Sequence, residues 1–332
     1  MSTDEQAVDQ LLGREPDNIA ALVRKGDFRT AAGDERAGTA FYKAALQAAA
    51  AARTLPMSLK PAIERAQAGM ARAAGVFARY LEQGLVGAGL PPAKRPPRFQ
   101  QSIDLMLGRR QASLQLQRPT SYYMPGLPQR PYYERSEFPW AAEVEAAAGA
   151  IREEMLAFSA ARGDRFSPYL VNDSSRPRGD FHGLLDNPDW STLYIWEKGA
   201  PVAEFAPAFP RTLRTMEQVD LPHIGVRAPS VLFSRLSAGA RIPAHNGMLN
   251  ARLICHLPLI VPPGCGFRVG GETRQWQEGE LLIFDDSVEH EAWNDGPSDR
   301  VVLIFDIWRP ELSAEERHAV TTMFEVIDSY GR

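Results

Sequence analysis

Five short apolar segments between residues 230 and 308 constrain the fold of this chain more than any other feature. Turns rich in glycine, proline and aspartate separate them, and each is short enough to be a single strand. This spacing is typical of an antiparallel β-sandwich or barrel. The five predicted strands are Ser230–Leu236, Asn250–Leu257, Gly266–Val269, Glu280–Phe284 and Val301–Trp308.

Helix-forming segments flank these strands on both sides. One is marked by apolar residues at a spacing of three to four, namely Val144, Ala148, Ile151 and Met155. Another covers Pro210 to Val219, and the run Ser313-Ala314-Glu315-Glu316 is a capping box that starts a C-terminal helix running toward Asp328. We therefore predict an α+β chain whose main domain is a double-stranded β-helix, that is, a jelly-roll or cupin-like domain with flanking helices.

The composition changes near residue 90, because residues 4–89 are rich in alanine and charged residues and have helical periodicity. Within them, Pro16 to Leu46 is similar to one tetratricopeptide-type helix pair, with Gly26 at a close-packing position. A stable solenoid needs about three repeats. We therefore predict a short all-α region over residues 1–90. It either docks a protein partner or a second copy of the chain, or it is a structural appendage.

Four prolines occur in the nine residues from Leu90 to Arg98. Such a segment is semi-rigid, so residues 91–114 are predicted to form a linker and a connecting helix. Residues 115–332 then make up the jelly-roll domain. The basic residues of this linker, Lys94, Arg95 and Arg98 among them, are expected at the solvated surface rather than against an anionic partner.

The composition also excludes several classes of protein. A net charge of -4 provides no basic field for nucleic acid. No run approaches the roughly 18 apolar residues of a membrane span. The acidic first residues do not resemble a secretory signal, and two cysteines make no disulfide framework. We expect a cytoplasmic protein with no nucleic-acid or membrane partner.

Two histidines and an arginine are the candidate chemical groups. His245 and His290 belong to different strand-like segments, and Arg300 begins another. Imidazoles are ligands for iron, and an arginine fork holds a carboxylate. The three residues therefore predict a non-haem iron site with an anionic co-substrate.

The period of two along a strand assigns further side chains to this site. Arg252, Ile254 and His256 share one face of their strand, and Arg300 shares a face with Asp306 in the last one. Charged side chains on otherwise apolar strands require an internal polar cavity. Several cationic groups in one barrel suit a dicarboxylate ligand.

With these motifs, residues from about 115 to 312 resemble the aspartyl/asparaginyl β-hydroxylase family of iron(II)/2-oxoglutarate oxygenases. The motifs occur in the family's order and spacing. The segments that carry the resemblance are His245-Asn246-Gly247, Asn250 to Leu257, Val261 to Gly266, Trp276 to Gly279, Phe284 to Trp293 and Arg300 to Pro310.

The resemblance implies a role for each candidate residue. His245 and His290 are the expected catalytic iron(II) ligands. Arg300 and Ser234 are expected to hold the distal carboxylate of the co-substrate 2-oxoglutarate, and His256 to lie near its other carboxylate. The remaining candidate catalytic residue, Arg252, would hold a carboxylate of the co-substrate or of the substrate.

The implied reaction hydroxylates an Asp- or Asn-type residue of a peptide or protein, or a related amino-acid-like small molecule, with succinate and carbon dioxide as co-products. One departure concerns Ile254, where some family members have a second arginine. This makes an acidic substrate side chain less well supported.

The metal site lacks a third protein ligand in the sequence. Related sites carry a carboxylate two residues after the first histidine, and here that residue is Gly247, so water would fill the position. The vacancy leaves an oxidative halogenase as one alternative to a hydroxylase. A non-catalytic jelly-roll binding module, with the helical region as its working part, is another.

Two groups of neighbouring residues have roles that the sequence leaves less specific. The acidic residues around His290 are expected to form a turn and to orient its imidazole by hydrogen bonds, rather than to bind metal; they are Asp285, Asp286, Glu289 and Glu291. Trp190, Tyr194 and Trp196 form an aromatic cluster that either packs in the core or walls a substrate pocket.

Overall fold

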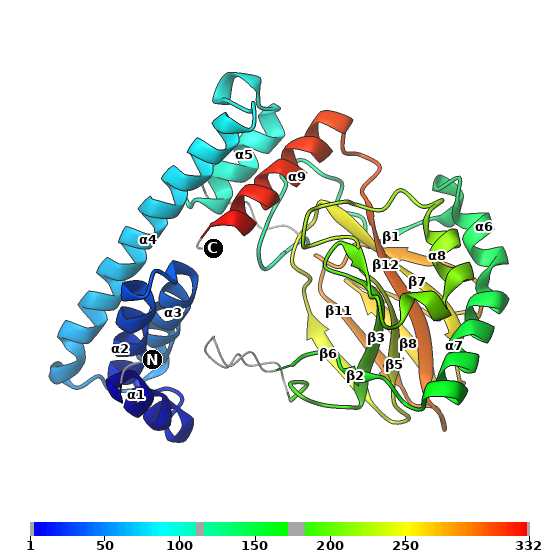
Figure 1. The fold of residues 1–332 in the computed structure, drawn as a ribbon, viewed down its shortest axis with the longest axis horizontal. Coiled ribbons are helices and arrows are strands. Elements are labelled where there is room, and N and C mark those ends of the chain that lie inside the picture. The colour runs from blue at the N-terminus through cyan, green and yellow to red at the C-terminus, as the bar shows by residue number, and fades with distance from the viewer. Residues whose placement is uncertain (1–2, 111–115, 172–182, 331–332) are drawn as a thin grey trace. The chain divides into compact units, whose positions relative to one another are not determined.

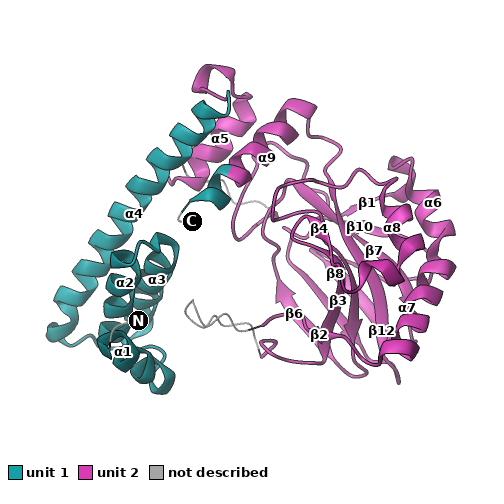
Figure 2. Cartoon of the chain, in the orientation of Figure 1, with its two compact units in different colours: residues 1–89, 172–181, 326–332 teal, residues 90–171, 182–325 magenta. Residues whose placement is uncertain are grey.

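The computed structural model describes residues 3–110, 116–171 and 183–330. The chain forms two compact units (Figure 2). The described part of the first consists of residues 3–89 and 326–330, and that of the second consists of residues 90–110, 116–171 and 183–325. None of the helices in these ranges is long and apolar enough to cross a membrane.

The first unit is helical, as predicted for the N-terminal region (Figure 1). Asn18 and Asp34 begin its second and third helices, since their side chains accept hydrogen bonds from the backbone N–H groups of Ala21 and Ala37. The helices are α1 (Thr3–Arg14), α2 (Ile19–Ala31), α3 (Glu35–Ala51) and α4 (Lys60–Gly87), with a 3-10 turn at Met57–Leu59 before α4.

Tyr42 of α3 is the centre of packing in this unit. A Cβ added at Gly26 of α2 would lie 2.7 Å from the Tyr42 ring, and one at Gly69 of α4 would lie 2.6 Å from it. The glycines therefore let three helices approach the same ring, which confirms Gly26 as a close-packing position. The relation of this helix pair to a tetratricopeptide repeat stays a prediction.

The second unit contains two antiparallel sheets, which confirms the predicted double-stranded β-helix. The eight-stranded sheet has the order β1 (Tyr132–Tyr133), β10 (Leu282–Phe284), β7 (Arg252–Ile260), β12 (Arg300–Trp308), β5 (Val231–Leu236), β3 (Trp190–Glu197) and β2 (Ser167–Pro168), with β4 (Ala200–Pro201) paired to β3. The four-stranded sheet has the order β6 (Arg241–His245), β11 (His290–Asn294), β8 (Cys265–Val269) and β9 (Glu272–Arg274).

Each face of the larger sheet packs on a different layer. Its inner face meets the smaller sheet in one apolar cluster, in which Phe284 of β10 lies 4.6 Å from Phe267 of β8 between ring centroids. Its outer face is covered by α6 (Ala141–Ala146), α7 (Ala148–Arg162) and α8 (Pro210–Met216) (Figure 1). The predicted first helix is thus two helices that meet at Ala147.

The side chains of β7 and β12 alternate between the two faces of the larger sheet as predicted. Leu253 and Leu257 join the outer cluster under the helices, as does Phe305 of β12. Arg252 and His256 lie on the opposite, inner face, as does Arg300 at the start of β12. The inner face therefore carries charged groups into the space between the sheets.

The proline-rich segment differs from the prediction, because its arginines are anchored instead of solvated. Arg95 is 6% exposed and donates to the Leu90 carbonyl and to Gln100 of α5 (Pro97–Met106). Arg98 holds Glu316 of α9 (Ala314–Ser329) with two hydrogen bonds of 2.7 and 2.6 Å. Proline has no backbone N–H, and in this segment the two guanidinium groups act as hydrogen-bond donors instead.

Glu316 also takes part in the capping box predicted at the start of α9. The backbone N–H of Glu316 donates to the Ser313 hydroxyl, and the Glu316 carboxylate accepts from the Ser313 N–H. Both of these backbone N–H groups, which have no partner within the helix, are hydrogen-bonded, so the helix begins where the sequence predicts.

A buried ion pair joins the end of the last strand to the segment before β11. Arg309 and Asp285 have fully buried side chains, with Nη1 2.6 Å from Oδ2. Arg309 also donates to the Pro128 and Asn250 carbonyls, and Asp285 accepts from Gln117. All charge in this network is compensated.

Breaking this pair from one side should destabilise the second unit strongly. Asp285→Asn leaves the buried Arg309 charge with the less buried Glu311 carboxylate, 3.3 Å from its Nε atom, so the free energy of unfolding should fall by up to about 3–5 kcal/mol. Asp295→Asn is the matched control, because Asp295 pairs with Arg241 at the surface and should cost at most about 1 kcal/mol. Urea unfolding followed by fluorescence measures both, and equal losses would contradict this assignment.

Candidate iron and co-substrate site

His245 and His290 are brought together by neighbouring strands of the smaller sheet. β6 ends at His245 and β11 begins at His290, and the two residues are paired in register. Their ring centroids lie 4.1 Å apart. The predicted pair of iron ligands is therefore adjacent in space, although whether the pair binds metal stays a prediction.

Backbone carbonyl groups orient both imidazole rings. The Nδ1 atom of His245 lies 2.8 Å from the Pro243 carbonyl oxygen, and that of His290 lies 3.0 Å from the Val288 oxygen. A ring that donates through Nδ1 carries its lone pair on Nε2, which is then the nitrogen able to bind a metal. Burial, followed by the neighbouring His245, lowers the pKa of His290 to about 3, so its ring is neutral as a metal ligand must be.

The carboxylates of the acidic residues around His290 have arginine partners, and their expected role in orienting its ring stays a prediction. Asp285 does form the predicted turn, because its carboxylate accepts from the Ser287 N–H and hydroxyl. Each of the four carboxylates pairs with an arginine: Asp285 with Arg309, Asp286 with Arg252, and both Glu289 and Glu291 with Arg268. Glu291 follows His290 in β11, so strand alternation directs its side chain to the opposite face, whereas Asp285 and Asp286 belong to the turn before this strand.

The space beside Gly247 is occupied by a carboxylate from elsewhere in the chain. A Cβ at Gly247 would overlap the Asp286 carboxylate, and the Gly247 N–H donates to the Asp286 carbonyl at 2.6 Å. A side-chain ligand at position 247 is therefore excluded by packing. The residues that the structure describes contain no group of three or more His, Cys, Asp or Glu placed to hold a metal ion, which leaves two imidazoles as the donor set.

Arg252 lies on the inner face of β7 between two carboxylates. Its Nη2 atom is 3.1 Å from Asp286 Oδ2, and its Nε atom is 3.9 Å from Asp306 Oδ2. Burial raises the pKa of Asp286 to about 6, against the opposing effect of Arg252. The sequence placed Arg252 and Asp306 on inward faces, but it did not reveal that they would pair.

Arg300 is buried without a carboxylate. It is 1% exposed, and its Nε and Nη2 atoms have no hydrogen-bond partner in the part of the chain that the structure describes. Its guanidinium group lies 4.8 Å from the centroid of the Trp276 ring. Burial lowers the pKa of Arg300 to about 10, so it stays charged near neutral pH. A buried, uncompensated cation is costly unless an anion binds it.

His256 and Arg300 meet at the same tryptophan. The Trp276 indole N–H donates to His256 Nδ1 at 3.2 Å, and the His256 ring packs between Phe267 and Phe284. Burial and then Arg300 hold the pKa of His256 well below its usual value. A role for Trp276 was not predicted. The signal that could have indicated one is its position in the segment Trp276 to Gly279, which carries the family resemblance.

Ser234 lies on the same inner face of the larger sheet. It is paired across the sheet with Val302, two residues beyond Arg300, and its hydroxyl accepts from the Trp190 indole at 3.3 Å. A strand pair therefore brings Ser234 and Arg300 to neighbouring positions on one face. Their joint role toward a carboxylate stays a prediction.

The members of the aromatic cluster, Trp190, Tyr194 and Trp196, have different surroundings. Trp190 lies 6.2 Å from His245 between ring centroids and stacks on Tyr169 at 4.2 Å. Tyr194 lines a cavity, whereas Trp196 packs against the outer core. A contact of Tyr169 with the site was not predicted, because the sequence around it contains no motif that indicates one.

Comparison with known proteins identifies this part of the chain with one family. The family model described as aspartyl/asparaginyl beta-hydroxylase matches residues 145–310. The mouse aspartyl/asparaginyl beta-hydroxylase is 37% identical over 41% of this chain, and the match spans only 18% of that protein. Human aspartate beta-hydroxylase domain-containing protein 2 is 32% identical over 63% of this chain and 55% of its own length.

A bacterial relative matches over a larger share of its own length. The ornithine lipid ester-linked acyl 2-hydroxylase of Rhizobium tropici is 33% identical over 69% of this chain and 76% of that protein. Solved structures match more weakly. A predicted oxalate decarboxylase of Thermotoga maritima covers 36% of this chain and 81% of its own at 13% identity with a TM-score of 0.24, which supports no conclusion about this chain.

Replacing His290 with alanine should abolish iron(II) binding while leaving the fold intact. The loss of affinity should exceed roughly 100-fold, because changes to residues that only orient a ligand already cost 10- to 100-fold. His318→Ala, at an exposed position of α9, is the control. Anaerobic iron titration and circular dichroism report binding and fold separately, and retained affinity in the His290 variant would contradict the site.

Proposed function

Because this chain belongs to the aspartyl/asparaginyl beta-hydroxylase family, we propose that it is an iron(II)- and 2-oxoglutarate-dependent hydroxylase. The observation that carries the proposal is Arg300, a buried guanidinium group whose Nε and Nη2 atoms have no hydrogen-bond partner among the described residues, and which shares the Trp276 indole with His256. A fixed cation of this kind is suited to one carboxylate of a small dicarboxylate.

The residues present fit the two absent groups. His245 and His290 would hold iron(II) through Nε2, and Arg300 with Ser234 would hold the distal carboxylate of 2-oxoglutarate. When bound, iron(II) and 2-oxoglutarate together activate dioxygen, so that a substrate C–H becomes C–OH while 2-oxoglutarate yields succinate and carbon dioxide. Among the described residues, no third His, Cys, Asp or Glu joins the two imidazoles as a metal-binding group, which suits a co-substrate that itself brings oxygen donors.

The chain's own residues orient these groups and exclude water. The Pro243 and Val288 carbonyls orient the two imidazole rings through Nδ1, which makes Nε2 of each neutral ring the nitrogen able to bind a metal. Trp276 packs against both His256 and Arg300. This keeps water from the guanidinium group and strengthens its attraction for a carboxylate.

One observation favours hydroxylation over halogenation. The volume beside Gly247, where a halide would need to enter, contains the Asp286 carboxylate. A chloride there would meet a group of the same sign whenever Asp286 is ionised. Product mass measured with chloride present tests this choice. A gain of one oxygen atom supports hydroxylation, and a chlorine isotope pattern would overturn it.

For the substrate, we propose an Asp- or Asn-type residue of a peptide or protein, or a related small molecule. The relatives' names cover both an aspartyl/asparaginyl hydroxylase and a lipid acyl hydroxylase, so family membership alone does not choose among substrates. A docking role for the N-terminal helices toward a protein partner or a second copy belongs to the same proposal.

Replacing Arg300 with methionine should weaken the use of 2-oxoglutarate. Since one or more charge-assisted hydrogen bonds are lost, the KM for 2-oxoglutarate should rise roughly 10- to 150-fold. Arg241→Met is the control, because Arg241 is exposed and pairs with Asp295. Succinate formation at varied 2-oxoglutarate gives the KM, and an unchanged value in the Arg300 variant would rule out its role.

Iron(II) and 2-oxoglutarate should bind cooperatively. If His245 and His290 are the protein ligands, the metal gains further donors from the co-substrate, and each should tighten the other's binding by the same factor. Chelator competition without oxygen measures the iron dissociation constant, which should fall at least about tenfold when 2-oxoglutarate is added. Succinate, which lacks the 2-oxo group, should have a smaller effect. An iron affinity independent of both acids would contradict the donor set.

A further inference from the structure

His256 shares two aromatic neighbours with the candidate iron ligand His290. Between ring centroids, Phe284 lies 4.8 Å from His256 and 5.6 Å from His290. Phe267 lies 5.2 Å from His256 and 6.0 Å from His290. Both histidines therefore belong to one aromatic cluster between the two sheets.

Trp276 connects His256 to Arg300. The indole N–H of Trp276 donates to His256 Nδ1 at 3.2 Å, and the centroid of its ring lies 4.8 Å from the Arg300 guanidinium group. One side chain thus contacts both of the residues that are expected to lie at the two carboxylates of 2-oxoglutarate.

The partner of Nδ1 decides which nitrogen of a neutral histidine carries the proton. An indole N–H can only donate, so Nδ1 of His256 accepts and the ring proton is on Nε2. The Nδ1 atoms of His245 and His290 face backbone carbonyl groups instead, so these neutral rings carry the proton on Nδ1. The site therefore contains both tautomers, with two lone pairs for a metal and one N–H donor at the Nε2 positions.

The Nε2–H donor of His256 has no partner within the chain as described. Burial, followed by the charge of Arg300, holds the pKa of His256 well below its usual value, so the ring is neutral and has a single N–H. His256 is 7% exposed, and no hydrogen bond to its Nε2 atom occurs within residues 3–110, 116–171 and 183–330. A carboxylate can accept from this N–H, whereas the other tautomer would direct a lone pair at the anion.

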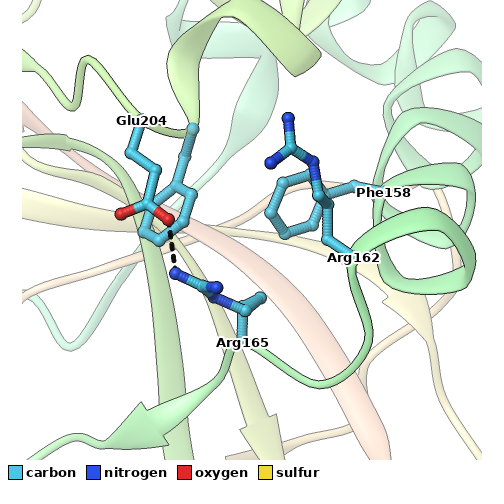
Figure 3. Close-up of a pocket in the computed structure, with 5 residues that line it drawn as sticks. Phe158, Arg162, Arg165 and Glu204 are labelled. Carbon is cyan, nitrogen blue, oxygen red and sulfur yellow. Dashed lines mark hydrogen bonds and ion pairs between the residues drawn. The ribbon is translucent and has the colours of Figure 1, made fainter.

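Arg165 is another arginine over an aromatic ring in this unit, and its charge is compensated. Its guanidinium group lies 5.4 Å from the centroid of the Phe205 ring and pairs with the Glu204 carboxylate, as Figure 3 shows. The Nε and Nη2 atoms of Arg300 have no such partner among the described residues, and Trp276 has an N–H that Phe205 lacks. Trp276 can therefore orient a second residue while it contacts the arginine.

We propose that Trp276 is a positioning residue for the co-substrate. It holds the proton of His256 on Nε2 and so makes that nitrogen a hydrogen-bond donor to the carboxylate of 2-oxoglutarate that Arg300 does not hold. The proposal rests on the proposed function, because it concerns 2-oxoglutarate at that same site. Trp276 acts through His256, and its ring keeps the Arg300 guanidinium group in place beside it.

Heteronuclear NMR of the metal-free full chain, with labelled histidine nitrogens, tests the tautomers directly. Nitrogen shifts and their couplings to the ring protons distinguish the two neutral forms, and a His256→Gln variant assigns the His256 signals. The expected result is a proton on Nε2 for His256 and on Nδ1 for His245 and His290. A proton on Nδ1 of His256 would overturn the proposal.

Replacing Trp276 with phenylalanine keeps a ring under Arg300 and removes the indole N–H. His256 should then populate both tautomers. The dissociation constant of 2-oxoglutarate for the iron(II)-loaded chain, measured by calorimetry without oxygen, should rise about three- to tenfold. Trp196→Phe is the matched control and should change neither quantity, because Trp196 is half-buried and its indole N–H has no partner among the described residues. An unchanged tautomer or affinity in the Trp276 variant would contradict the proposal.

A double-mutant cycle separates positioning from packing. In a His256→Leu background no imidazole remains to be oriented, so Trp276→Phe should weaken 2-oxoglutarate binding by less than about twofold. The full loss in that background would show that Trp276 acts through Arg300 or packing alone, and would overturn the proposal. If the unsubstituted iron-loaded chain binds no 2-oxoglutarate, the proposed function fails as well. If it binds 2-oxoglutarate and the variants behave otherwise, only this inference is lost.

Discussion

The buried ion pair between Arg309 and Asp285 is the interaction on which the site depends. It joins the end of β12 to the segment that leads into β11, and β11 begins with His290. Asp285 also holds the turn through Ser287. Two strands from different sheets are thereby fixed relative to each other, so the imidazole pair is placed by a structural network that contains neither histidine.

Arg300 begins β12 and Arg309 directly follows its last residue, and the two arginines have opposite environments. Both are buried, but Arg309 has two carboxylates and two backbone carbonyls as partners, whereas Nε and Nη2 of Arg300, which lies over an indole ring, have no partner among the described residues. The fold can therefore satisfy a buried guanidinium group where stability requires it. A buried guanidinium group left unsatisfied on an inward face, next to the indole that also contacts His256, is the arrangement expected of a ligand site rather than of a core. Arg252 is the intermediate case, since its charge is compensated but it lines the inner face.

The inward positions of Arg252, His256 and Arg300 could be predicted, because strand alternation depends only on local sequence. Their partners could not, because pairing of Arg252 with Asp286 depends on long-range strand register. The same limit applies to the acidic residues near His290, whose arginine partners come from other segments. The solvated positions predicted for Arg95 and Arg98 were wrong, since their partners reflect the packing of α5 and its neighbours. The two-imidazole site was predictable as a set of residues, but Trp276 and Tyr169 were not, because their contacts are tertiary.

The central claim is that Arg300 and the two imidazoles form one site for a metal and a dicarboxylate. A crystal structure of the full chain, grown without oxygen in iron(II) and 2-oxoglutarate, tests it most directly. The account predicts a metal bound to Nε2 of both His245 and His290, with a carboxylate of 2-oxoglutarate within hydrogen-bond distance of the Arg300 guanidinium group. A metal bound elsewhere, or a co-substrate that does not contact Arg300, would contradict it.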